Sequence, residues 1–175
     1  MVLGSFTGVR IGVSTVKAFC DITSIPAVGI NSLEGLAYNG LNSNYINKTN
    51  LICSIIDAKN DNVYFGMFEK DNNNTFSCIF EPSAQNIDDA IKQLKKYHSS
   101  HILFIGDGAE KYQYLISQIF SKATFVEDKH NSQTSTSFGK AAFHHYQMLD
   151  YGDSNSIIPM YLKKSQAERA LEGEK

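Results

Sequence analysis

Residues 51–68 read LICSIIDAKNDNVYFGMF, which is two apolar runs on either side of a short polar break. The runs at 51–56 and 63–68 are rich in β-branched and aromatic residues, as strands are. The break at 59–62, Lys-Asn-Asp-Asn, favours a tight turn, so the stretch predicts a β-hairpin. A second polar turn leads to a third strand-like run at 75–80. Three consecutive antiparallel strands are therefore expected at the centre of the fold.

The C-terminal half of the chain alternates between helix-like and strand-like segments. The expected helices cover 87–97, 110–120 and 136–149, and the expected strands cover 101–105 and 123–126. Alternation of this kind packs helices against a sheet, which predicts an α/β layered fold.

The N-terminal segment 5–20 has a helical pattern with apolar residues on two sides. One side carries Phe6, Val9, Val13, Val16 and Cys20, and the opposite side carries Ile11, Ala18 and Phe19. A helix of this kind must be covered on both sides, so we expect it to associate with a partner. The alternative is that the chain's own fold buries both sides. The candidate contact residues are Phe6, Val9, Arg10, Val13, Ser14 and Lys17.

The composition is that of a globular protein, and it argues against several function classes. Hydrophobic residues make up 42% and charged residues 19% of the 175 residues, and the net charge is −2. This balance argues against a chain that grips phosphates by itself, because nucleic-acid-binding proteins usually carry a basic footprint. Cys20, Cys53 and Cys78 have spacings that support neither a zinc ribbon nor a disulfide framework. Without a signal-peptide pattern or a membrane-spanning apolar run, we expect a cytoplasmic protein.

No motif of the chain predicts a catalytic site, and two stretches are weak candidates for a ligand or metal. A phosphate-binding loop, a dinucleotide-binding fingerprint and a nucleophile elbow are all absent from the sequence. His144-His145 has no Asp, Glu or Cys at ligand spacing, which favours an ordinary surface or half-buried pair over a metal site. Gly106-Asp107-Gly108 opens a helix, where free N–H groups favour anions, although the glycines can simply serve the strand-to-helix turn. Asp57 ends a strand and is expected to stabilise the hairpin that follows.

Two motifs near the ends of the chain are specific enough to indicate a family. Residues 4–12 read GSFTGVRIG, and residues 159–169 read PMYLKKSQAER. Between them, IPAVGINSLE at 25–34 and IDAK at 56–59 follow in the expected order. These motifs resemble those of the TsaB (YeaZ) family, and the resemblance runs the length of the chain.

The resemblance implies an actin-like α/β fold of the ASKHA (ribonuclease H-like) type, with two lobes. The family's segment before Gly4 is missing, so the first lobe is expected to be truncated at its N-terminus. The implied division is a remnant of the first lobe at 1–50, a second α/β lobe at 51–158 and a C-terminal helical tail at 159–175.

The resemblance also implies a non-catalytic scaffold for tRNA modification. Members of the family pair with the catalytic protein TsaD, and the ATPase TsaE joins the larger complex, which forms N6-threonylcarbamoyladenosine beside the anticodon. The expected partners are therefore TsaD-like and TsaE-like proteins, with a homodimer as a further option and tRNA reached only through the complex. No cofactor is expected. Where TsaD carries two metal-binding histidines, this chain has Ser32 and Leu36, so no metal is expected.

Two other classes of function stay open. One is an enzyme of the same superfamily, either peptidase-like or kinase-like. The missing histidines count against the first version, and the missing phosphate loop counts against the second. The other class is a small-ligand or nucleotide-binding module that uses Gly106, Asp107 and Gly108.

Overall fold

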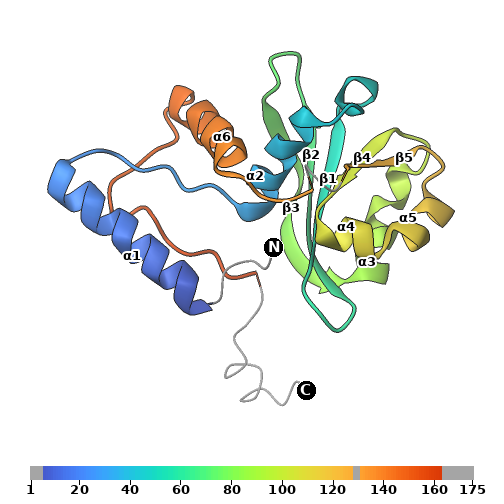
Figure 1. Cartoon of the computed structure of the whole chain (residues 1–175), viewed down its shortest axis with the longest axis horizontal. Helices are drawn as coiled ribbons and strands as arrows, with labels where there is room; N and C mark the ends of the chain where they lie inside the picture. The colour runs from blue at the N-terminus through green and yellow to red at the C-terminus, as the bar shows by residue number, and fades with distance from the viewer. Residues whose placement is uncertain (1–5, 128–130, 163–175) are drawn as a thin grey trace.

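The computed structural model describes residues 6–127 and 131–162 and has a five-stranded mixed sheet at its centre (Figure 1). The strand order is β3-β2-β1-β4-β5. The strands are β1 (Leu51–Asp57), β2 (Asn62–Lys70), β3 (Phe76–Asn86), β4 (Ile102–Ile105) and β5 (Ala123–Phe125). β2 pairs antiparallel with both β1 and β3, whereas β4 pairs parallel with both β1 and β5. The predicted meander and the predicted α/β fold class are confirmed.

The first hairpin has the turn that its sequence predicts. Lys59, Asn60 and Asp61 all have positive φ, at 63°, 52° and 54°. Asn and Asp tolerate this region better than most residues, because their short polar side chains can hydrogen-bond locally. The backbone N–H of Ala58 donates to the carbonyl of Asn62 at 2.9 Å, which closes the hairpin.

The third strand is longer than predicted, because it continues past Pro82 to Asn86. The predicted strand stopped at residue 80, and a proline within a strand offers no N–H to the sheet ladder. β3 is an edge strand with only β2 beside it. A backbone N–H that is absent from the outer side of an edge strand therefore costs no hydrogen bond between strands. A register shift opposite Phe65 and Met67 further adapts the two strands to each other.

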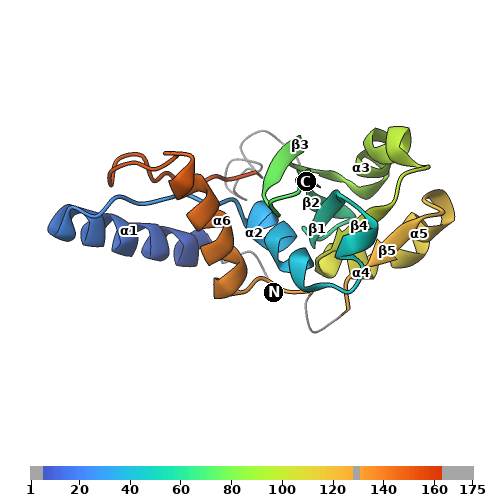
Figure 2. The ribbon, with the colours of Figure 1, turned by 90° about the horizontal axis from the view of Figure 1, so that it is seen from above.

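Helices cover both faces of the sheet (Figures 1 and 2). One face is covered by α3 (Ile87–Leu94), η3 (Lys95–Tyr97), α4 (Asp107–Lys111) and α5 (Gln113–Ile119), and the other by α2 (Ser32–Asn39) and α6 (Ser135–Gln147). Alternate strand residues point to opposite faces, so Ile102 and Phe104 join the first core while Leu103 and Ile105 join the second. Two short helices, η1 (Gly40–Asn42) and η2 (Ile46–Lys48), lead from α2 into β1.

The helices predicted between residues 5 and 149 are present, with one difference. The helix expected at 110–120 is divided into α4 and α5 at Tyr112, whose φ and ψ of −102° and 17° are not helical. α2 begins after Asn31, whose side-chain oxygen accepts from the N–H of Leu33 and so caps the helix.

The N-terminal helix α1 (Phe6–Thr23) lies apart from these layers (Figures 1 and 2). The coil that follows it makes one isolated bridge, between Ala27 and Gly152. The predicted division at residue 50 stays a prediction, and α2, which precedes it, packs into the same core as Ile52 and Leu103. Most of the predicted tail helix at 159–175 lies outside the described residues. No helix in the described part of the chain is both long and apolar enough to cross a membrane.

Candidate functional site

The helix α1 is the most exposed apolar element of the described structure. None of its residues from Thr7 to Thr23 is buried. Ile11, Phe19 and Ile22 are 63%, 66% and 84% exposed. Leaving large side chains in water sacrifices about 1.5–3 kcal/mol of burial free energy for each of them, so a cluster like this one commonly marks an interface.

These side chains border a shallow groove that belongs to α1 alone. Its lining is Arg10, Ile11, Ser14, Thr15, Ala18, Phe19 and Ile22. Ser14, Thr15 and Ala18 are the small residues of this lining, and Ile11, Phe19 and Ile22 are its large apolar ones. Such a groove suits the apolar side chains of a second helix packed along it.

The opposite side of α1 faces the chain's own body. Val9, Val13, Lys17 and Cys20 are half-buried there, at the spacing of one helical face. The C-terminal segment runs alongside the helix (Figure 1), and the guanidinium Nε of Arg10 donates to the hydroxyl of Tyr161 at 3.3 Å.

The structure thus divides the six predicted contact residues between two sides. Arg10 and Ser14 line the exposed groove, while Val9, Val13 and Lys17 are half-buried. The side chain of Phe6 lies outside the described part. Their role as partner contacts stays a prediction. The sequence pattern had already placed Ile11 and Phe19 on the second apolar side, but only the structure shows that this side is the uncovered one.

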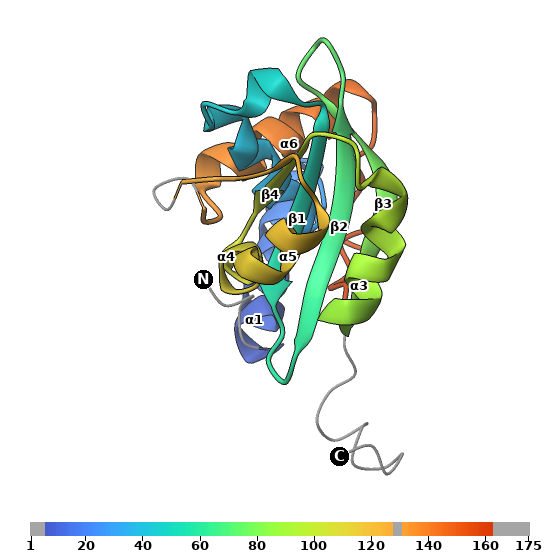
Figure 3. The same cartoon turned by 90° about the vertical axis from the view of Figure 1, so that its right-hand side faces the viewer.

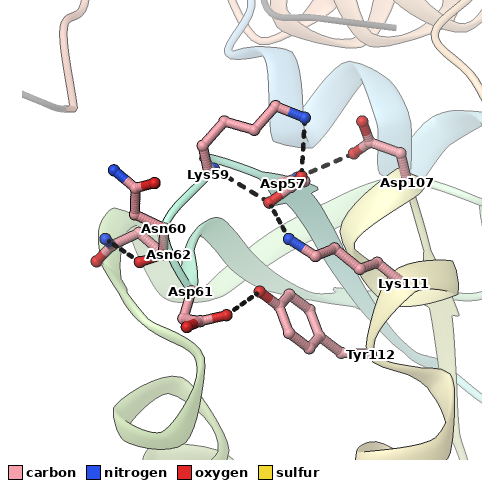
Figure 4. Close-up of polar contacts among 8 residues, drawn as sticks. All are labelled: Asp57, Lys59, Asn60, Asp61, Asn62, Asp107, Lys111 and Tyr112. Atoms are coloured by element: carbon pink, nitrogen blue, oxygen red, sulfur yellow. Dashed lines mark hydrogen bonds and ion pairs between the residues drawn. The ribbon is translucent and has the colours of Figure 1, made fainter.

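A polar cluster, separate from α1, lies where the parallel strands β1 and β4 end (Figure 4). Asp57 at the end of β1 is 10% exposed, and its carboxylate binds the ammonium groups of Lys59 at 3.1 Å and Lys111 at 3.0 Å. Its backbone N–H donates to a carboxylate oxygen of Asp107 at 3.0 Å. The cluster ties the first hairpin to α4, so the prediction that Asp57 stabilises the hairpin is confirmed.

The charges in this cluster already neutralise one another. Burial of the Asp57 carboxyl acts to raise its pKa, but the hydrogen bonds from Lys111 and Lys59 outweigh it and hold the pKa below its usual value. The hydrogen bond to Asp57 correspondingly raises the pKa of Lys111. Asp57 is thus held as a carboxylate by two ion pairs, which suits a structural link better than a catalytic base.

Gly106 and Gly108, the glycines of the predicted ligand turn, make close backbone contacts. Gly106 has a φ of 110°, and a Cβ there would lie 2.2 Å from the carbonyl oxygen of Ile55. A Cβ on Gly108 would lie 2.8 Å from Cγ2 of Ile55. The N–H of Gly106 already donates to the side chain of Asn131, and the first turn of α4 carries acidic residues. The contacts support the structural role of these glycines, and the ligand site stays a prediction.

The two positions compared with metal-binding histidines lie at the start and middle of α2. Leu36 is 2% exposed in the second core, and Ser32 begins the helix. Across residues 6–127 and 131–162, no three His, Cys, Asp or Glu side chains lie close enough to hold a metal ion.

We expect elemental analysis of the purified chain to find no stoichiometric zinc or iron, because an alkyl side chain cannot donate a lone pair to a metal. The analysis should be repeated on Leu36→Met, which keeps the core volume. An equivalent of tightly bound metal, lost on substitution of Leu36, would contradict the assignment.

A histidine between two carboxylates joins α6 to α2, and the sequence pattern missed it. His145 Nε2 lies 2.7 Å from Glu34 Oε1, and its Nδ1 lies 2.6 Å from Asp150 Oδ2. Burial acts to lower the pKa of His145, but its hydrogen bonds to Asp150 and Glu34 outweigh burial and raise it above 6.5. No local signal could have found this contact, since Glu34 is 111 residues away.

The His145 link predicts a pH-dependent contribution to stability. Because the folded pKa lies above the ordinary value of 6.5, the link stabilises fully below that pH and weakens as pH rises through the folded pKa. We expect His145→Gln to lower the free energy of unfolding by on the order of 1 kcal/mol at low pH and by less at high pH. Urea unfolding of both proteins at pH 6 and pH 9 measures the difference.

The neighbouring His144→Gln provides the control for this prediction. Its side chain stacks edge-on against His145 at 6.0 Å without sharing the carboxylates. A loss of stability at His145 that is the same at both pH values, or that His144→Gln reproduces, would contradict the ionic nature of the link.

Comparison with known proteins finds the following similarities. Residues 4–171 match the family described as "TsaD: tRNA N6-adenosine threonylcarbamoyltransferase". A Bacillus subtilis (strain 168) protein named "tRNA threonylcarbamoyladenosine biosynthesis protein TsaB" is 28% identical over 167 residues, which are 94% of this chain and 68% of that protein.

Two solved structures from Pseudomonas aeruginosa have a similar fold. One, titled an uncharacterized protein with similarity to peptidase YEAZ, superposes with a TM-score of 0.71 and 17% identity over 93% of this chain and 70% of that chain. The other, titled YeaZ, superposes with a TM-score of 0.67 and 15% identity over 91% and 71%.

Proposed function

The chain belongs to the family described as TsaD, tRNA N6-adenosine threonylcarbamoyltransferase, and within it to the TsaB (YeaZ) group, and from that membership we propose that it is an accessory subunit in threonylcarbamoyladenosine formation. It acts as a scaffold that pairs with a TsaD-like catalytic subunit, and a TsaE-like ATPase joins the larger assembly. Its place of action is the cytoplasm, where tRNA is modified.

The observation that carries this proposal is the uncovered apolar side of α1. The helix presents Ile11, Phe19 and Ile22 around a groove of its own, while its other side lies against the chain. A helix-on-helix contact buries these side chains and fixes the orientation of the partner.

The described chemistry supports a non-catalytic role. The carboxylate of Asp57 is occupied by two lysines, and the position of Leu36 offers no ligand to a metal. A peptidase-like or kinase-like enzyme has less support, because neither an activated nucleophile nor a phosphate cradle can be assembled from these residues.

The test is to mix the purified chain with a TsaD-like protein of the same organism. We expect a stable heterodimer by size-exclusion chromatography with light scattering, and stimulation of threonylcarbamoyl transfer to tRNA. If neither the heterodimer nor the stimulation appears, the proposal is wrong. A homodimer alone would assign the exposed side of α1 to self-association.

A further inference from the structure

Four lysines and two histidines gather at one end of the sheet, although the net charge of the chain is −2. The parallel strands β1, β4 and β5 start at this end, because Leu51 pairs with Ile102 and Ile102 with Ala123. We define the basic edge as the exposed side chains just before these strands, which are Lys48, Lys95, Lys96, His98, His101 and Lys122. In Figure 3 this end is uppermost, opposite the turn between β1 and β2.

Backbone contacts hold the segments of the basic edge together. The hydroxyl of Thr49, next to Lys48, donates to the carbonyl of His101. The N–H of His98 donates to the carbonyl of Lys95 at 3.1 Å. The first contact joins the segment before β1 to the start of β4, and the second orders the turn that leads from η3 toward β4.

The four lysines of the basic edge are not neutralised by neighbouring carboxylates. Within the described ranges, none of their ammonium groups lies within 4.0 Å of an Asp or Glu. At the opposite end of the sheet, by contrast, Lys59 and Lys111 are both paired with Asp57. Two exposed carboxylates lie at the same end of the sheet, because Glu69 pairs with Leu51 and Asp71 follows in the turn after β2. The four lysines outnumber these two carboxylates, so this end of the sheet carries more positive than negative charge.

Aromatic rings lie beneath two of these lysines. The ammonium of Lys48 is 5.2 Å from the ring centre of Tyr45. That of Lys96 is 4.6 Å from the ring of Phe80 and 5.1 Å from the ring of Tyr97. Cations interleaved with half-exposed aromatic rings suit nucleic acid, since phosphates bind the cations and bases stack on the rings.

We infer that the basic edge binds the sugar-phosphate backbone of RNA. The inference rests on the proposed function, which makes tRNA the substrate of the assembly, and adds direct contacts from this chain. Strands lie about 4.8 Å apart, so the starts of β1, β4 and β5 span about 10 Å, the reach of about three phosphates. The small negative net charge keeps the attraction local, and binding by the chain alone is weak, with a Kd on the order of 10⁻⁵ M.

The test measures fluorescence anisotropy of a labelled, unmodified tRNA transcript titrated with the full chain over a range of salt concentrations. The test variant is Lys96→Gln with Lys122→Gln on the basic edge. The control is Lys59→Gln with Lys140→Gln, which removes the same two charges elsewhere. We expect the test variant to weaken binding at least about fivefold and to flatten the salt slope by about 1.4–1.8, and the control to change binding less than about twofold.

Capture of the TsaD-like partner is measured on the same proteins, so the two proposals fail separately. Equal weakening in both double variants, or no tRNA binding by the unmodified chain at low salt, overturns the RNA inference whatever the partner assay gives. If the test variant loses partner capture and keeps tRNA binding, the basic edge faces an acidic protein surface and the RNA inference is wrong.

Discussion

Phe19→Glu is expected to abolish capture of the TsaD-like partner while leaving the folded chain unchanged. Phe19 is 66% exposed at the rim of the α1 groove, so a glutamate there stays in water in the free chain. In a complex the carboxylate would be buried against apolar side chains without a partner charge, which costs several kcal/mol. We expect at least a 100-fold weaker Kd by calorimetry, on the scale of an interface hot spot. Circular dichroism should show unchanged helical content and thermal midpoint.

Tyr114→Glu is the matched control for Phe19→Glu. Tyr114 is an aromatic residue on α5 that is 80% exposed, and the same new charge there lies on the far side of the sheet. Its partner affinity should stay within about twofold of the original. Unchanged capture by Phe19→Glu, or equal loss in both variants, would remove the exposed side of α1 from the interface.

Val13→Glu distinguishes the two sides of α1. Val13, one of the predicted contact residues, is half-buried on the side that faces the chain's own body. If Val13→Glu weakens capture and Phe19→Glu does not, the partner binds the half-buried side after displacing the neighbouring coil.

Gly106→Ala is expected to be the most destabilising small substitution in the described chain. The residue has a φ of 110°, and the added methyl carbon would lie 2.2 Å from the carbonyl oxygen of Ile55. Backbone strain and the displaced strand together should lower the free energy of unfolding by about 3 kcal/mol or more. Urea unfolding followed by circular dichroism measures the loss.

Gly139→Ala gives the opposite expectation. Gly139 is inside α6, and no atom lies within 4 Å of the position of an added Cβ. Removing the conformational freedom of a helical glycine should stabilise the chain by about 0.5–1 kcal/mol.

If Gly106→Ala unfolds at the same urea concentration as the original chain, the close approach of α4 to β1 is not required for stability.

The central elements of the fold follow from short-range patterns that one sequence displays. The runs at 51–56 and 63–68, with the Lys-Asn-Asp-Asn break between them, predicted the hairpin, because strand preference and turn chemistry act between neighbours. Where the pattern failed, the decisive fact was the position of a segment in the assembled sheet. The predicted third strand ended at residue 80, whereas β3 continues through Pro82, which is tolerated because β3 is at the edge.

The candidate sites depend much more on tertiary structure. The sequence by itself determined the family motifs at 4–12 and 159–169 and the two apolar sides of α1. Only the folded chain decided which side of α1 stays uncovered. It also brought His145 to Glu34 across 111 residues and collected the basic edge from segments around Lys48, Lys96 and Lys122. Helix and turn preferences act over a few residues, whereas burial and ion pairing depend on which distant segments the packed core brings into contact.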